Sequence, residues 1–263
     1  MRRPNLNQQL HDAVAHHQSG RIEPAYRLYA QVRRSAPGAF DAWHLGGLAA
    51  HQLGRHREAR SLLERALVLS PRSALCALRL GAAQLALGEP EAAETNFRRA
   101  LQDTPTMAEA WEHLSLALLQ QGRPDAALEA ALAGARHCPG SASLHERASA
   151  LTADRHGFAA ALPLLVATTE SFPSHAAGWK NLGLALATLH RAEDALAALD
   201  RALGLEPDLV AARLGRALAL QEAFRLDEAV AEYDAVLALA PAHAAAASAR
   251  LLCLNYDERL TTP

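Results

Sequence analysis

Aromatic residues make up only 5% of this sequence, and no run of about eighteen apolar residues occurs, so we expect no membrane-spanning helix. Neither sign of charge is in excess, since 26 lysines and arginines stand against 28 aspartates and glutamates. The charge therefore favours neither nucleic acid nor an anionic membrane as a partner. The three cysteines, Cys76, Cys138 and Cys253, lack metal-ligand spacing and are consistent with reduced thiols. Half of the residues are apolar, mainly alanine and leucine, which suits closely packed helices.

The two ends carry little targeting information. Residues 1–20 contain two arginines but no apolar stretch after them, so we expect no signal peptide and a cytoplasmic protein. The last residues, 261–263, show no natural terminus signal, which is consistent with a piece excised from a longer protein.

The most regular feature is a ladder of prolines spaced 34 residues apart, formed by Pro37, Pro71, Pro105, Pro139, Pro173, Pro207 and Pro241. An alanine lies twelve residues before each of them, at Ala25, Ala59, Ala93, Ala127, Ala161, Ala195 and Ala229. With proline at its average usage of about 5%, chance would produce such a ladder with odds on the order of one in ten million or less. The chain is therefore a tandem repeat, which grows by stacking units rather than around one central core.

The ladder divides the chain into seven units, 6–39, 40–73, 74–107, 108–141, 142–175, 176–209 and 210–243. Each unit has two blocks of apolar residues at helical spacing, separated by a short turn. Four units have a glycine at the same turn position, Gly20, Gly54, Gly88 and Gly122. We therefore predict seven pairs of antiparallel helices, preceded by a leader at 1–5 and followed by a capping helix at 244–260 and a tail at 261–263.

These residues resemble the tetratricopeptide repeat (TPR), whose pattern is W-x₂-L-G-x₂-Y…A-x₃-F…P. The match is best at Trp179, Leu182, Gly183, Ala195 and Pro207, and it covers about residues 6 to 254. The resemblance implies an all-α fold, a right-handed α-solenoid of about seven TPR helix pairs with a C-terminal capping helix. Small residues such as Gly47, Gly81, Gly183 and Ala217 are expected to let the two helices of a pair approach closely.

Two units depart from the pattern. The fifth has His145, Ala148 and Ser149 where the pattern has Trp, Leu and Gly, and Pro163 lies inside its expected second helix. We predict a late helix start or a kink at Pro163, and the weakest packing of the array, because the proline ring would clash with the preceding turn. The seventh has Arg213 and Arg216 in place of Trp and Leu. The array is expected to bend or open at these two units.

A second resemblance concerns the segment LLCLNYDERLTTP at 251–263. It is similar to the junction that follows the TPR region in bacterial relatives of the O-linked N-acetylglucosamine transferase/SPINDLY family. This resemblance implies a substrate-recruiting arm whose catalytic glycosyltransferase domain is absent from the chain. Such transferases carry a ladder of asparagines on the groove, and of the seven corresponding positions here only Asn181 is an asparagine.

The sequence does not indicate an enzyme. Most of its thirteen histidines are expected on solvated faces or turns, and no HExxH, CxxC, nucleophile-elbow, phosphate-binding or dinucleotide-binding motif accompanies them. Paired carboxylates such as Glu193 and Asp194 lie where second helices start, and there they complement the helix dipole. We therefore predict no catalytic residues, no metal site and no cofactor.

The resemblance to TPR arrays implies that the first helix of each pair lines a concave groove. The groove-facing positions predict a peptide-binding site made of His11, His44, His51, Arg79, Glu112, His113, Glu146, Arg147, Lys180 and Asn181. Such a mixed polar and apolar strip suits an extended peptide or a partner helix. Three hypotheses stay open: a scaffold that binds a peptide or protein in this groove, the transferase arm, and self-association through the terminal repeats.

Overall fold

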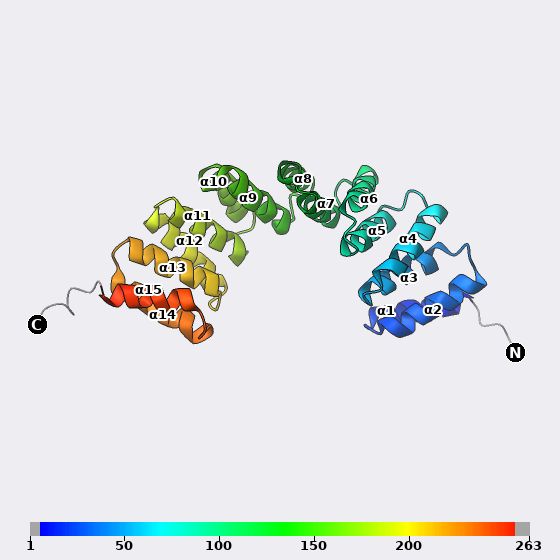
Figure 1. Cartoon of the computed structure of the whole chain (residues 1–263), viewed down its shortest axis with the longest axis horizontal. Coiled ribbons are helices and arrows are strands. Elements are labelled where there is room, and N and C mark those ends of the chain that lie inside the picture. Colours follow the sequence, from blue (N-terminus) through cyan, green and yellow to red (C-terminus); the bar gives the residue numbers. More distant parts are fainter. Residues whose placement is uncertain (1–5, 256–263) are drawn as a thin grey trace, which may run out of the picture. The chain divides into compact units, whose positions relative to one another are not determined.

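The computed structural model describes residues 6–255, and in this range the chain forms fifteen α-helices and no strand (Figure 1). The first helices of the pairs are α1 (Leu6–Gln18), α3 (Phe40–Gln52), α5 (Ala74–Ala86), α7 (Ala108–Gln120), α9 (Ala142–His156), α11 (Ala176–Thr188) and α13 (Val210–Glu222). The second helices are α2 (Ile22–Ser35), α4 (His56–Leu69), α6 (Pro90–Asp103), α8 (Pro124–His137), α10 (Phe158–Ser171), α12 (Ala192–Leu205) and α14 (Leu226–Leu239). The last helix, α15 (Ala244–Asn255), begins 34 residues after α13. The prediction of an all-α array of helix pairs is confirmed.

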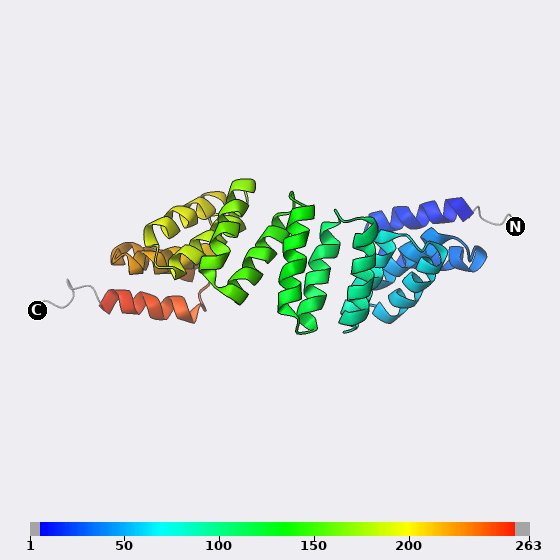
Figure 2. The ribbon, with the colours of Figure 1, turned by 90° about the horizontal axis from the view of Figure 1, so that it is seen from above.

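The chain divides into two compact units, with α1–α8 in the first and α9–α15 in the second. From here on, 'unit' means one of these two, and each 34-residue repeat is called a pair. Within each unit every helix packs against the next helix in the sequence, so the helices lie side by side in chain order (Figure 2). First helices of neighbouring pairs also contact each other, α3 with α5, α5 with α7, and α11 with α13. Among the described residues, second helices do not approach one another as closely. Each unit therefore has a surface formed by its first helices, called the first-helix face below.

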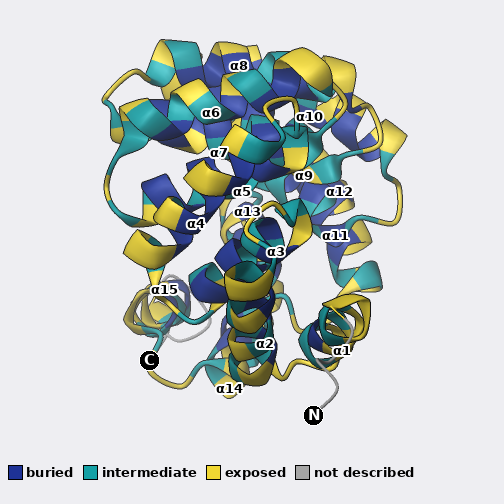
Figure 3. Cartoon of the chain, turned by 90° about the vertical axis from the view of Figure 1, so that its right-hand side faces the viewer, coloured by how far each residue is buried: buried dark blue, intermediate teal, exposed yellow. Residues whose placement is uncertain are grey.

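The core of each unit lies where helices meet, as the buried residues in Figure 3 show. The alanines of the twelve-before-proline ladder are all fully buried. A Cβ added to Gly47 would lie 2.6 Å from the Leu63 side chain, and one added to Gly183 would lie 2.5 Å from Leu199. These separations are too short for carbon atoms, so only glycine permits the observed approach. The predicted role of the small residues is confirmed at these glycines.

The turns inside the pairs follow the glycine pattern. Gly20, Gly54, Gly88 and Gly122 have φ between 71° and 75°, a left-handed conformation that glycine adopts without steric cost. Two later pairs have a residue with a side chain at the equivalent position, His190 and Phe224, each with φ of 57°. The turn therefore keeps its left-handed conformation in these two pairs, although the residue there has a side chain.

The fifth pair has a different turn. Its first helix, α9, has 15 residues where the other first helices have 13, and a single residue, Gly157, joins it to α10. Gly157 has φ of 85° and ψ of 165°, a backbone region open essentially to glycine alone. The α9 helix thus runs on through the place where the other pairs turn.

The expected late start of the second helix in this pair is wrong. Helix α10 begins at Phe158, in the same register as the other second helices, and runs through Pro163. The proline cannot donate a hydrogen bond to the carbonyl of Ala159. Ala159 is exposed, so water can satisfy that carbonyl and the helix need not be broken.

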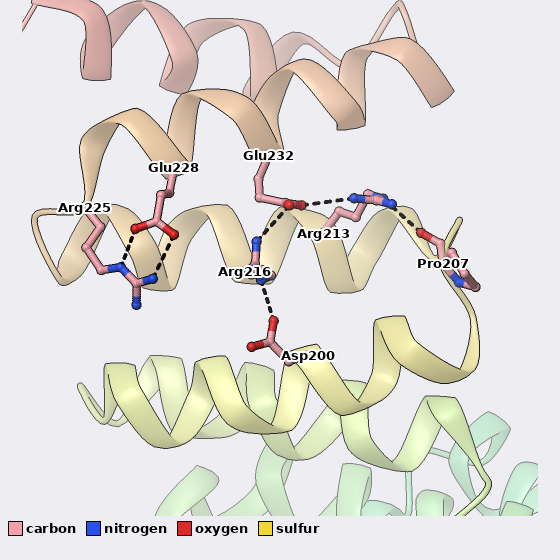
Figure 4. Close-up of polar contacts among 7 residues, drawn as sticks. All are labelled: Asp200, Pro207, Arg213, Arg216, Arg225, Glu228 and Glu232. Carbon is pink, nitrogen blue, oxygen red and sulfur yellow. Dashed lines mark hydrogen bonds and ion pairs between the residues drawn. The ribbon is translucent and has the colours of Figure 1, made fainter.

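The seventh pair keeps its packing with charged residues (Figure 4). In the second, fourth and sixth pairs a tryptophan indole donates to the carbonyl of the preceding ladder proline, at 2.8 to 3.0 Å. Arg213 replaces that tryptophan, and its Nε donates to the carbonyl of Pro207 at 2.9 Å. Glu232 accepts from both Arg213 and Arg216, and Arg216 also reaches Asp200 at 2.6 Å. These ion pairs link α12, α13 and α14 at the positions where the sequence lacks its usual apolar residues.

Candidate functional site

A pocket of about 210 Å³ lies on the first-helix face of the second unit, between α9 and α11 and above α10. Two of the predicted groove residues, Glu146 and Asn181, line it. The other lining residues are Ser149, Ala150, Ala153, Asp154, Phe158, Leu165 and Leu184. The pocket therefore combines apolar walls with two carboxylates, an amide and a hydroxyl.

The sequence of this pair differs from the others at a position that lines the pocket. Ser149 occupies the position at which Gly47 and Gly183 permit close approach of the two helices. The residue facing that position in the second helix is a leucine here too, Leu165, and both Ser149 and Leu165 line the pocket. Serine and leucine together are bulkier than the glycine and leucine at the same positions of the second and sixth pairs.

The polar groups of the pocket come from two helices, with Asn181 on α11 and the other three on α9. The Ser149 hydroxyl is buried and donates to the carbonyl of His145 at 2.9 Å. A carboxylate oxygen of Glu146 is hydrogen-bonded to the Nε2 of His175, the residue that precedes α11. Asp154 is exposed near the end of α9. No lysine, arginine or histidine lines the pocket, so the charges that border it are both negative.

Three predicted residues come together on the first-helix face of the first unit. Arg79 of α5 forms an ion pair with Glu109 at 2.7 Å, and His113 of α7 lies 3.8 Å from the same carboxylate. His51 of α3 lies against His56, with 3.1 Å between the two Nδ1 atoms. Burial lowers the pKa of His51, and the neighbouring His56 lowers it further. This cluster therefore has one carboxylate among an arginine and three histidines, in contrast to the pocket of the second unit.

His44 does not lie on the open surface on which the sequence placed it. Its side chain is 6% exposed and stacks on the ring of Phe40, with centroids 5.3 Å apart. Its Nε2 is buried without a hydrogen-bond partner in the described part of the chain. Burial, with the charge of Arg79 as a smaller cause, lowers the pKa of His44, so the ring is held neutral. The sequence could not show that Phe40 would cover this position.

The remaining predicted residues lie on first helices but outside the pocket. His11 is exposed on α1, while Glu112 on α7, Arg147 on α9 and Lys180 on α11 are half-buried. That these residues bind a peptide stays a prediction. The repeat pattern did not point to Asp154 and Phe158. The signal that could have found them is the turn glycine of the fifth pair, which lies at Gly157 and not at the expected position 156.

The remaining observations on residues 6–255 concern metal binding, membrane insertion and cysteine reactivity. No group of three or more histidine, cysteine or acidic side chains gathers there in a way that could hold a metal ion. None of the described helices combines the length and the apolar character that crossing a membrane requires. The three cysteines are buried and free, and burial raises the pKa of the Cys76 thiol to about 12. That thiol is therefore protonated and unreactive at neutral pH.

Comparison with solved structures shows the fold of known repeat proteins. The C-terminal part of a TPR repeat-containing protein from Cytophaga hutchinsonii superposes with a TM-score of 0.74 and 12% identity, over 91% of this chain and 98% of that one. PilF from Pseudomonas aeruginosa gives 0.62 and 19%, over 78% and 93%. YrrB, described as a TPR protein with an unusual peptide-binding site, gives 0.54 and 20%, over 70% and 95%.

A search among curated proteins finds no match. The family model of the tetratricopeptide repeat, in contrast, matches residues 13–74, 78–142, 147–209 and 187–244. These segments cover most of the chain and include both compact units. The chain therefore belongs to the tetratricopeptide repeat family.

Proposed function

We propose that this protein is a non-enzymatic scaffold that binds an extended peptide, or a peptide-like segment of a partner protein, on its first-helix face. The observation that carries the proposal is the pocket between α9 and α11, where Glu146 and Asn181 meet apolar walls. TPR proteins of the same fold supply a precedent, since YrrB is described as having a peptide-binding site.

The geometry suits a peptide better than a small molecule. The pocket volume of about 210 Å³ is below the roughly 300–1,000 Å³ of pockets that enclose drug-sized ligands. It is large enough for one amino-acid side chain. The amide of Asn181 can both donate and accept a hydrogen bond, which is what an extended peptide backbone offers at each residue.

Selection of peptides from a displayed random library on the full chain tests the proposal. We expect enriched peptides to bind the Asn181→Ala variant about tenfold more weakly in fluorescence anisotropy, since a lost hydrogen bond costs about 1–1.5 kcal/mol. Gln31→Ala is the matched control, because it removes an exposed amide from the second helix α2. Failure to enrich any peptide, or equal binding by Asn181→Ala and the wild type, would contradict the proposal.

A second candidate, the recruiting arm of a glycosyltransferase, rests on the resemblance of residues 251–263. Most of that segment lies outside the described residues, and the comparisons supply no support for this finer assignment. A gene sequence that continues beyond Pro263 into an α/β domain would favour the arm. A stop codon at that point would favour the free-standing scaffold.

Self-association through the terminal repeats also stays a proposal. Leu251 and Leu252 of α15 are exposed on the last described helix, and exposed apolar residues at the end of an array can pack against another chain. Light scattering at several concentrations tests this, and a constant monomeric mass would exclude it. The expected cytoplasmic location likewise stays a prediction.

A further inference from the structure

We propose that the pocket between α9 and α11 selects a lysine or arginine side chain of the bound peptide. The inference rests on the proposed function, because it names the residue that anchors the peptide on the first-helix face. It goes beyond that function by assigning a charge and a shape to the ligand.

The negative charges that line the pocket favour a cationic ligand. Glu146 and Asp154 are its two charged lining residues, and both are acidic. His175 occupies the Oε1 atom of Glu146, whereas the described residues offer Asp154 no hydrogen bond or ion pair. A peptide cation would therefore supply the partner that Asp154 lacks, and it would do so at the rim, where Asp154 is exposed.

The walls of the pocket suit the stem of a basic residue. Leu165, Leu184 and the two alanines Ala150 and Ala153 line its interior, and lysine and arginine bury their methylene stems along such apolar surface while the charged head reaches polar groups. Phe158, the first residue of α10, also lines the pocket and is 38% exposed, and an aromatic ring in such a place can attract a cation. An acidic or small polar side chain would gain neither contact.

The same positions three repeats earlier have a different chemistry. There His44, Gln52 and Arg79 take the places of Glu146, Asp154 and Asn181. His44 is buried and Arg79 is already paired with Glu109. The acidic pocket is therefore a property of the pair formed by α9 and α10 and not of the repeat in general, which is what a selective subsite requires.

The test uses the peptides that depend on Asn181, together with copies in which each lysine or arginine is replaced in turn by norleucine. For one such position we expect about two- to fivefold weaker binding to the wild type, the upper part of the range for an ion pair at the surface. Asp154→Asn should weaken the parent peptide by a similar factor and leave the norleucine peptide unchanged. Binding of the parent should also weaken as salt is raised.

Glu170→Gln is the matched control, since it removes one exposed carboxylate from α10 outside the pocket. It should change neither peptide. Because Asp154 is exposed, its replacement should leave the melting temperature unaltered, which circular dichroism checks. Peptides that need Asn181 but contain no basic residue, or that bind Asp154→Asn as tightly as the wild type, would overturn the inference and leave the proposed function intact. Peptides that bind without needing Asn181 would instead contradict the proposed function.

Discussion

Replacing Phe224 with glycine should stabilise the protein, although it removes a large aromatic side chain. Phe224 lies in the turn between α13 and α14 with φ of 57°, where four other pairs have glycine. Its side chain is 88% exposed, so its removal sacrifices almost no packing. The left-handed conformation costs a residue with a Cβ about 1–2 kcal/mol, and glycine avoids that cost.

The gain is partly offset in the unfolded chain. Glycine has more conformational freedom to lose on folding, which costs about 0.5–1 kcal/mol relative to alanine. We therefore expect Phe224→Gly to raise the free energy of unfolding by about 0.5–1 kcal/mol, equivalent to about 1–4 °C in Tm for a chain of this size. Phe224→Ala should be nearly neutral, because alanine keeps the strain and loses only exposed surface.

Comparing Phe224→Gly with Phe224→Ala separates the effect of backbone strain from that of side-chain contacts. Urea denaturation followed by circular dichroism measures the total change, and hydrogen exchange of the α13 and α14 amides shows whether it is local. Equal stability of the glycine and alanine variants would refute the strain argument. His190 has the same φ, but it is a less clean test because its Nδ1 contacts Glu222 at 2.5 Å.

Three further changes test other parts of the fold. Gly157→Ala should lower the free energy of unfolding, measured in urea, by about 1–3 kcal/mol, because the backbone conformation at this position is open essentially to glycine even though no atom crowds it. An unchanged midpoint would contradict this. Ala195→Leu should overpack the crossing of α11 and α12 and lower the free energy of unfolding by about 1–3 kcal/mol, which is measured as a lower Tm. For His44, burial lowers the pKa below the usual 6.5, so the folded state favours the neutral ring, and stability is lost as pH falls below 6.5. His44→Leu should flatten this part of a stability-against-pH curve, and an unaltered slope would show that another group causes it.

The repeat and its helices could be predicted from the sequence because the information is local. The proline and alanine ladders mark the same two positions in every pair, and both ladders reflect contacts between residues only a turn or a helix apart. The glycine turns were predictable for the same reason, since a left-handed residue is a property of one position. Where Arg213 replaces the tryptophan, the pattern predicted that the array bends or opens, and this stays a prediction. The structure shows that Arg213 donates to the carbonyl of Pro207, the equivalent of the proline carbonyl to which Trp179 donates.

The candidate site was predictable only in part, because its shape depends on pairs of residues. Glu146 and Asn181 were assigned to the groove from their repeat positions, and the structure places both at one pocket. His44 has a position equivalent to that of Glu146 and is nevertheless buried against Phe40. A uniform assignment of faces cannot distinguish these two cases, since the neighbour that covers one of them lies outside the repeat pattern.

The pocket lies in the pair whose turn differs from the others. Two of its lining residues, Asp154 and Phe158, lie on either side of Gly157, the single residue that joins α9 to α10. The first-helix position that is glycine in the second, third and sixth pairs is Ser149 here, and Ser149 lines the pocket as well. A pocket in this array thus needs no inserted loop and no added domain. The polar residues that α9 and α11 carry beside it give the space its chemistry.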